Sequence, residues 1–126
     1  MSEQVDGNDT VSDEEIRERR LEILENESLV QLFSSPANVR FLVVLIDSAE
    51  DLTASALARQ AGVSRSAWYD NRDLLLDLNL VEVTRESAGA THYALADSEQ
   101  AKQVIRLYDA LRLWSFRHTD VSVSIF

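Results

Sequence analysis

The sequence predicts a fold that is mainly α with a small β-hairpin, an α+β class. Apolar residues recur at helical spacing over most of the chain. Two short segments, residues 81–86 and 91–96, instead alternate apolar and polar residues around Gly89, which is the pattern of a hairpin. The chain has 126 residues, of which 45% are hydrophobic, so we expect one domain with a single buried core and short extensions.

Several protein classes are excluded or disfavoured by what the sequence lacks. It has no cysteine, which excludes a disulfide scaffold, a thiol nucleophile and a Cys-based zinc site. Its two histidines, His92 and His118, form no metal-binding motif, and no phosphate loop or catalytic triad stands out. No apolar run approaches the roughly 18 residues of a membrane span, and the acidic N-terminus is unlike a signal or transit peptide. We therefore expect a cytoplasmic protein that is not an enzyme and has no cofactor, metal or membrane partner.

The charge balance is strongly acidic. Twelve basic residues stand against 22 acidic ones, for a net charge of −10, and residues 1–27 alone hold 10 acids and 3 arginines. Only one of the basic residues, Lys102, is a lysine. This acid-rich, lysine-poor composition resembles that of proteins from extreme halophiles, in whose molar salt only close charge contacts matter. The alternative is an acidic protein of ordinary cytoplasm with a biased composition.

The N-terminal part of the chain is expected to hold a tail and three helices. Residues 1–12 have no periodicity and are predicted to form a disordered acidic tail. A helix follows Asp13, and Ser28 is a candidate N-cap for a short second helix. Pro36 suits the first turn of a third helix, which we expect to be buried and central. Its predicted inward face comprises Val39, Leu42, Val43 and Ile46, with Phe41 and Leu45 beside them.

The middle of the chain contains two helices joined by a tight turn. Thr53 is a good N-cap for a helix over residues 54–61, and Ser64 is one for the helix that follows. Gly62 is expected to adopt the left-handed conformation between them, and Asn79 can end the second helix at positive φ. The side chains expected to close a small core here are Leu57, Val63, Leu75 and Leu80.

The C-terminal part is predicted to be one helix with a short extension. Asp97 or Ser98 is a candidate cap for a helix that runs to residue 116. Residues 117–126 are expected to be a tail or a short strand, because apolar residues alternate with serines over residues 121–126. The predicted domain therefore spans residues 13–116.

A longer motif runs through the two middle helices. It reads L-T-x-x-x-L-A-x-x-x-G-V-S and is matched by Leu52, Thr53, Leu57, Ala58, Gly62, Val63 and Ser64. Leu80 and Val81 follow where a wing hairpin opens, with Asn79 in the place of the usual glycine, and SSPANVRFLVVLID looks like the opening helix of the same class. Residues 33–96 thus resemble the winged helix-turn-helix of bacterial and archaeal transcription regulators. The whole architecture is similar to ArsR-like and PadR-like regulators, of a haloarchaeal type, which dimerise through terminal helices.

The resemblance implies a homodimer that binds a pseudopalindromic operator in double-stranded DNA. Residues 64–78 would enter the major groove, and the wing over residues 81–96 would lie at the minor groove or the backbone. The residues expected to contact DNA are Arg59, Ser64, Arg65, Ser66, Trp68, Tyr69, Arg72, Thr84, Arg85 and Thr91. The residues expected at the dimer interface are Ile16, Ile23, Leu24, Leu107, Leu111 and Trp114.

Some of these positions leave two interpretations open. Trp68 stands where a smaller aliphatic residue is usual and either packs in the core or contacts bases. Arg72 stands where a buried leucine is usual and either pairs with an acid inside the protein or faces DNA. Arg85 either contacts DNA or pairs across the hairpin with Glu82 or Glu86.

A second function class is a winged-helix module that binds proteins in a transcription or replication assembly. Asp70 and Asp73 on the second middle helix would repel phosphates, and the wing carries no polybasic segment, which both favour this alternative. The arginines at 59, 65, 72 and 85 favour DNA binding instead.

Overall fold

The computed structural model describes residues 12–124, with side chains described for residues 12–117. It divides into two compact units between Ser34 and Ser35, a boundary that falls inside the domain predicted over residues 13–116. Most of the predicted disordered tail, residues 1–11, lies outside the described part of the chain.

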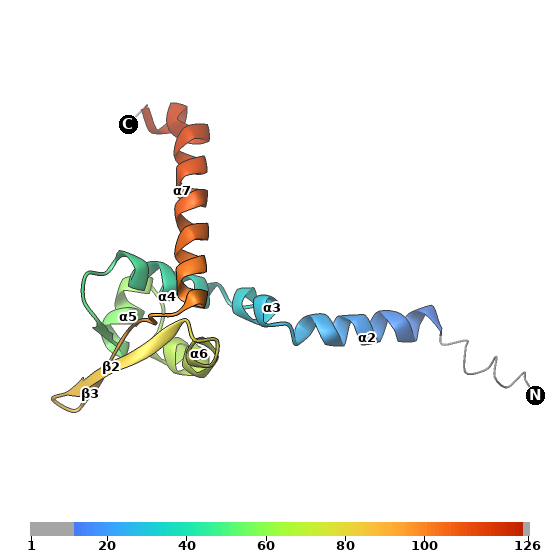
Figure 1. Cartoon of the computed structure of the whole chain (residues 1–126), viewed down its shortest axis with the longest axis horizontal. Coiled ribbons are helices and arrows are strands. Elements are labelled where there is room, and N and C mark those ends of the chain that lie inside the picture. Colours follow the sequence, from blue (N-terminus) through green and yellow to red (C-terminus); the bar gives the residue numbers. More distant parts are fainter. Residues whose placement is uncertain (1–11, 125–126) are drawn as a thin grey trace, which may run out of the picture. The chain divides into compact units, whose positions relative to one another are not determined.

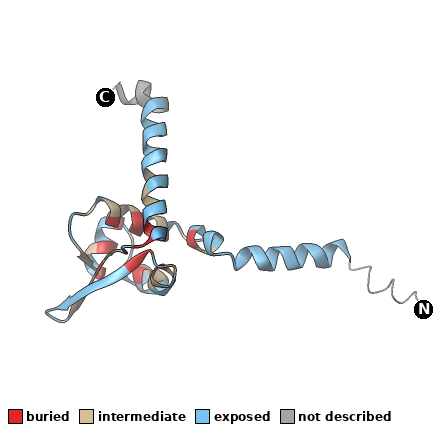
Figure 2. Ribbon diagram, viewed as in Figure 1, coloured by how far each residue is buried: buried red, intermediate tan, exposed pale blue. Residues whose placement is uncertain are grey.

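The first unit contains helices α2 (Asp13–Glu25) and α3 (Ser28–Phe33). Helix α2 begins with a capping box, in which the Glu15 amide donates to Ser12 Oγ at 3.0 Å and the Ser12 amide donates to Glu15 Oε1 at 3.4 Å. The prediction that Ser28 caps α3 is wrong, because Glu27 occupies the N-cap position and Ser28 is already helical. Every residue of α2 is exposed (Figure 2).

The second unit is an α+β arrangement, as predicted (Figure 1). In chain order its elements are α4 (Pro36–Asp47), β1 (Leu52–Thr53), α5 (Ala54–Ala61), α6 (Arg65–Asp77), β2 (Val81–Ser87), β3 (Ala90–Leu95) and α7 (Glu99–Ser124). The strands form an antiparallel sheet in the order β1-β3-β2, with Leu52 opposite Tyr93 and Val81 opposite Leu95. The hairpin was predicted, whereas β1 is too short for its alternation to be seen in the sequence.

Aromatic side chains from three elements form the centre of the core. Trp68 of α6 is fully buried and makes edge-to-face contacts with Phe41 of α4 at 5.0 Å and with Tyr93 of β3 at 4.8 Å between ring centroids. Of the predicted core residues, Leu57, Leu75 and Leu80 are buried, whereas Val63 is only partly buried. This cluster fixes α6 against both the sheet and α4.

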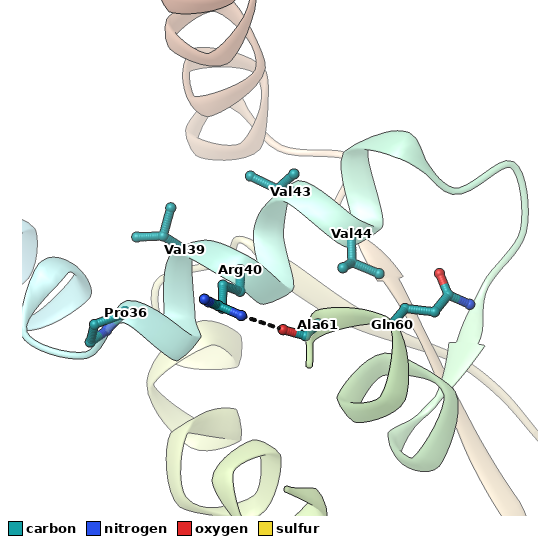
Figure 3. A pocket seen from close by; sticks show the side chains of 7 residues that line it. All are labelled: Pro36, Val39, Arg40, Val43, Val44, Gln60 and Ala61. Carbon is teal, nitrogen blue, oxygen red and sulfur yellow. Dashed lines mark hydrogen bonds between the residues drawn. The ribbon is translucent and has the colours of Figure 1, made fainter. Parts of the chain in front are cut away.

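The buried face of α4 differs from the predicted one. Its buried residues are Asn38, Phe41, Leu42 and Leu45. Of the predicted inward residues only Leu42 is buried, whereas Val39, Val43 and Ile46 are only partly buried. The helix is apolar nearly all round, so periodicity alone could not select its inward face. Val39, Val43 and Val44 instead line an open depression of about 460 Å³ together with Gln60 and Ala61 of α5 (Figure 3).

The predicted caps and turns of the two middle helices are confirmed. Thr53 Oγ1 accepts from the Ala56 amide and Ser64 Oγ accepts from the Ala67 amide, each at 3.2 Å. Gly62 has φ of 74° and ends α5 in the left-handed conformation. Arg40 of α4 donates from Nη1 to the Ala61 carbonyl at 3.0 Å (Figure 3). This side-chain hydrogen bond also caps the C-terminus of α5, and the sequence did not predict it.

The end of α6 and the start of α7 are tied together. Asn79 has φ of 60°, as predicted, and its carbonyl accepts a hydrogen bond from Ser98 Oγ at 2.6 Å. Ser98 Oγ also accepts from the Ala101 amide at 3.0 Å, so Ser98 is the residue that caps α7. Tyr108 Oη donates to Asp47 at 3.1 Å and joins α7 to the end of α4.

Helix α7 is longer than predicted. It extends to Ser124, so the strand predicted over residues 121–126 is wrong for residues 121–124, and residues 125–126 lie outside the described part. A short alternation of valine and serine can continue an existing helix, because each residue added to a helix that has already formed gains one backbone hydrogen bond. None of the helices in the described part is long and apolar enough to cross a membrane.

Candidate nucleic-acid interface

The first turns of α6 present a polar face to solvent. Ser64 begins the helix, and Arg65, Ser66, Tyr69 and Asp70 are all exposed. Ser64 Oγ and Ser66 Oγ lie 3.0 Å apart and share a hydrogen bond. The amides at this helix end and these short hydroxyls are suited to donate hydrogen bonds to the oxygens of a phosphate.

Tyr69 lies at the middle of this face between two arginines. Its side chain is 48% exposed, and the guanidinium carbons of Arg65 and Arg72 lie 5.8 and 5.9 Å from its ring centroid. Each distance is within the range of a cation–π contact. The three side chains therefore form a continuous aromatic and cationic surface, which we call the Tyr69 cluster.

Arg72 is held from the inside by a phenol rather than by an acid. Its Nη1 donates to Tyr93 Oη at 3.1 Å, and Nε lies 3.6 Å from the exposed carboxylate of Asp73. The hydrogen bond to Tyr93 raises the pKa of the Arg72 guanidinium above its usual value, with a smaller contribution from Asp73. The Arg72 side chain is 38% exposed, so it remains partly accessible to solvent while it is bound to Tyr93.

Trp68 does not belong to the interface. Its side chain is fully buried between Phe41 and Tyr93, and DNA could reach it only if the core opened. The prediction that Trp68 contacts DNA is therefore wrong, and the core interpretation is correct. The physical reason is that position 68 points inward, one position before the exposed Tyr69.

The tip of the wing lies beside the start of α6. Strands β2 and β3 are joined by Ala88 and Gly89, whose φ values of 55° and 77° are those of a type I′ hairpin turn. A shallow depression of about 160 Å³ separates the wing tip from the two middle helices. It is lined by Thr53, Ala54, Ser55, Arg65, Tyr69, Gly89, Ala90 and Thr91. Recognition-helix and wing residues that were predicted separately, Arg65, Tyr69 and Thr91, thus share one surface.

Arg85 and Thr84 form a separate group at the base of the wing. Arg85 donates from Nε to Asp51 Oδ2 at 3.1 Å and from Nη2 to Asp51 Oδ1 at 3.3 Å. Thr84 Oγ1 donates to the same Oδ2 at 2.5 Å. These contacts lower the pKa of Asp51 to about 2, chiefly through the hydrogen bond from Arg85. The cross-strand partners predicted for Arg85, Glu82 and Glu86, are therefore wrong; Glu86 instead accepts from Thr91 Oγ1 at 3.5 Å.

The remaining candidates lie outside both groups or concern the dimer. Arg59 is exposed on the last turn of α5. All of the predicted dimer residues are exposed, namely Ile16, Ile23, Leu24, Leu107, Leu111 and Trp114. Leu113 and Phe116 extend the exposed apolar surface of α7.

Sequence reasoning missed Asp51, which contacts Arg85, and Ser55, which lines the depression beside the wing tip. Asp51 reaches Arg85 from 34 positions away, and its partner is set by a two-residue strand that has no sequence signature. Nothing in the spacing of these residues could have indicated the contacts. Among residues 12–117, whose side chains the structure describes, no group of three or more His, Asp or Glu side chains is arranged to hold a metal ion.

Comparison with known proteins finds similar chains among solved structures. No protein-family model and no curated protein matches the chain. The transcriptional repressor BigR from Xylella fastidiosa is similar with a TM-score of 0.57 at 20% identity, over 82% of this chain and 96% of that one. HlyU from Vibrio cholerae is similar with a TM-score of 0.55 at 25% identity, over 67% of this chain and 87% of that one.

A third similar structure is described as homodimeric. It is the winged helix-turn-helix DNA-binding domain of a possible ArsR-family regulator from Mycobacterium bovis, with a TM-score of 0.57 at 18% identity. The match covers 86% of this chain and 93% of that one. The element order, the three-stranded sheet and these similarities agree with the fold expected from the sequence motif. The chain therefore has the winged helix-turn-helix fold of solved transcriptional regulators.

Proposed function

We propose that this protein is a sequence-specific, double-stranded DNA-binding transcription regulator. The observation that carries the proposal is the Tyr69 cluster, because it places two guanidinium groups and a phenol on the exposed face of α6 beside the wing tip. A helix of this kind enters the major groove, where arginine reads guanine or clamps a phosphate. Arg65, Ser66 and Tyr69 would contact the groove, and Thr91 would contact the adjacent backbone.

The protein would act as a homodimer through α2 and α7. Both helices expose apolar side chains in the single chain, and a two-fold pair of α6 helices would fit half-sites about 34 Å apart on a pseudopalindrome. The homodimeric domain from Mycobacterium bovis supports this proposal. The acidic, lysine-poor composition supports a high-salt cytoplasm as the working environment.

A protein-binding module in a transcription or replication assembly is the second candidate. It is favoured by Asp70 and Asp73, which are exposed on α6, and by the neutralisation of Arg85 by Asp51. A gel shift with genomic fragments in molar potassium chloride separates the two candidates. A retarded fragment that resists competition by unrelated DNA supports the regulator, whereas no shift over the whole salt range supports the protein-binding module.

A further inference from the structure

A β-bulge in strand β2 brings two hydrogen-bond donors to one carboxylate. Val83 is paired with Tyr93 and Arg85 with His92, so Thr84 is an extra residue in β2. In a regular strand, neighbouring side chains point to opposite faces of the sheet. Here the side chains of Thr84 and Arg85 both reach Asp51, with three donor–acceptor contacts between 2.5 and 3.3 Å. The bulge therefore aims the arginine at an acid of the same chain.

Asp51 is the fixed member of this group. It directly precedes β1, where Leu52 is paired with Tyr93 of the central strand. Its side chain is 17% exposed, whereas that of Arg85 is 56% exposed. The carboxylate thus lies on the protein side of the guanidinium, and the free edge of the guanidinium faces solvent.

The contact between Asp51 and Arg85 uses one of the two edges through which a guanidinium can donate two parallel N–H groups to a phosphate. An arginine binds both carboxylate and phosphate through two parallel N–H groups. While Nε and one N–H of Nη2 donate to Asp51, a DNA phosphate has either to displace the carboxylate from this edge or to accept from the outer edge, formed by Nη1 and the second N–H of Nη2. The carboxylate also cancels the charge that would attract the phosphate. Asp51 therefore opposes DNA contact at the base of the wing in two ways.

We propose that Asp51 is a positioning residue that occupies Arg85 as an intramolecular substitute for a DNA phosphate and thereby lowers the affinity of the wing for DNA. This proposal rests on the DNA-binding function proposed above. Because a phosphate is the same in every sequence, the restraint acts on all duplexes alike. As a result, Asp51 makes DNA binding depend more on the contacts of α6 than on contacts with the DNA backbone.

The test compares two substitutions that remove the same charge. Asp51→Asn keeps an acceptor for Thr84 and removes the negative charge that holds Arg85. Glu50→Gln removes a neighbouring charge that also acts on Arg85, but the hydrogen bonds of Glu50 to Ser48 are made by its backbone. Affinities for a genomic duplex and for an unrelated duplex are measured by fluorescence anisotropy, with each substitution also made in an Arg85→Gln background.

We expect Asp51→Asn to tighten binding of both duplexes on the order of tenfold per contacting protomer, the effect of one charge-assisted contact. Glu50→Gln should change affinity much less, and the gain should disappear in the Arg85→Gln background. Unchanged or weaker binding by Asp51→Asn, or equal gains from both substitutions, overturns the proposal.

A measurement without DNA separates this proposal from the proposed function. The Nε–H resonance of Arg85 should shift in Asp51→Asn and stay in place in Glu50→Gln, because only the first substitution alters the acceptor of that group. If the resonance shifts and the wild-type protein binds no duplex, the DNA-binding function fails and the restraint on DNA contact fails with it. If the wild-type protein binds DNA and Asp51→Asn binds no better, only the role of Asp51 fails.

Discussion

Arg72 of α6 donates a hydrogen bond to the phenol oxygen of Tyr93 at 3.1 Å and so joins the exposed face of α6 to β3, the central strand of the sheet. The ring of Tyr93 is buried against Trp68, while the head of Arg72 remains partly exposed beside Tyr69. The contact therefore connects the core to the Tyr69 cluster.

The hydrogen bond between Arg72 and Tyr93 should contribute modestly to stability. We expect Tyr93→Phe to lower the free energy of unfolding by about 1 kcal/mol, because the ring still fills its place and only one hydrogen bond is lost. Tyr93→Ala should cost about 3–5 kcal/mol, because it also leaves a cavity beside Trp68. Urea unfolding followed by tryptophan fluorescence measures both. Equal losses for Phe and Ala would show that the hydroxyl, and not the packing of the ring, dominates.

Gly62 should tolerate substitution poorly for two separable reasons. It adopts φ of 74°, and a Cβ at this position would lie 3.3 Å from Arg40 Nη1. We expect Gly62→Val to prevent formation of the turn and to abolish cooperative unfolding, because a β-branched residue resists positive φ. Gly62→Ala should cost about 1–3 kcal/mol.

Gly89→Ala is the matched control for this prediction. Gly89 has φ of 77° but no atom within 4 Å of an added Cβ, so it reports the backbone strain without the contact to Arg40. Thermal unfolding should show a smaller loss for Gly89→Ala than for Gly62→Ala. A folded Gly62→Val variant that binds DNA would refute the role of this turn.

Arg65 should contribute to sequence selectivity. We expect Arg65→Ala to weaken binding to the specific site by about 1–3 kcal/mol and to relax selection at one base pair, if the guanidinium reads a base. Arg106, an exposed arginine of α7, is the matched control, and Arg106→Ala should leave selectivity unchanged. Selection of bound sequences from a randomised duplex library measures this. A uniform loss of affinity at all positions would assign Arg65 to a phosphate instead.

The low pKa of Asp51 predicts a specific change in acid stability. The folded-state pKa is lowered from 3.8 to about 2, so the stabilisation by Asp51 is present above pH 3.8 and is lost as the pH falls through 2. We expect Asp51→Asn to remove this part of the acid dependence and to flatten the curve of stability between pH 4 and 2. Circular dichroism of both proteins over this range measures it. Parallel curves would show that Asp51 titrates normally in the folded protein.

The sequence was sufficient to predict the elements whose signals are local. The caps Thr53 and Ser64, the positive φ of Gly62 and Asn79, and the hairpin around Gly89 each depend on a few neighbouring residues. These local signals, together with the motif over residues 52–64, were enough for the fold.

What could not be predicted depends on contacts between distant residues. The inward face of α4 is set by the aromatic cluster around Trp68, and the partner of Arg85 is set by a two-residue strand and a bulge. Periodicity in an almost uniformly apolar helix carries no information on its face, and an isolated aspartate carries none on its partner. The sequence therefore predicted which helices and strands form the candidate site, but only some of the residues in it.

The dependence of DNA binding on salt should be unusually weak. An ordinary basic protein releases counterions, so log affinity falls with log salt at about −0.9 for each phosphate neutralised. Here Arg85 is neutralised by Asp51, and Arg72 lies beside Asp73. Few arginines without an acidic neighbour therefore remain to neutralise phosphates of the DNA backbone. Asp70 and Glu82 are exposed nearby and would take up cations when they approach phosphates, which offsets the release from DNA. We expect a shallow or even positive slope, with binding preserved in molar potassium chloride.

Titrating binding from about 0.3 to 2 M potassium chloride measures this slope over a range in which diffuse charge interactions are screened. Neutralising Asp70 or Glu82 should make the slope more negative, because each substitution removes a group that takes up cations. Asp51→Asn should do the same by about 0.9 per protomer, since Arg85 would then neutralise one phosphate more. A wild-type slope near −4 or steeper per dimer would show that ordinary counterion release governs the complex. It would also remove the reason to connect the acidic composition with DNA binding at high salt.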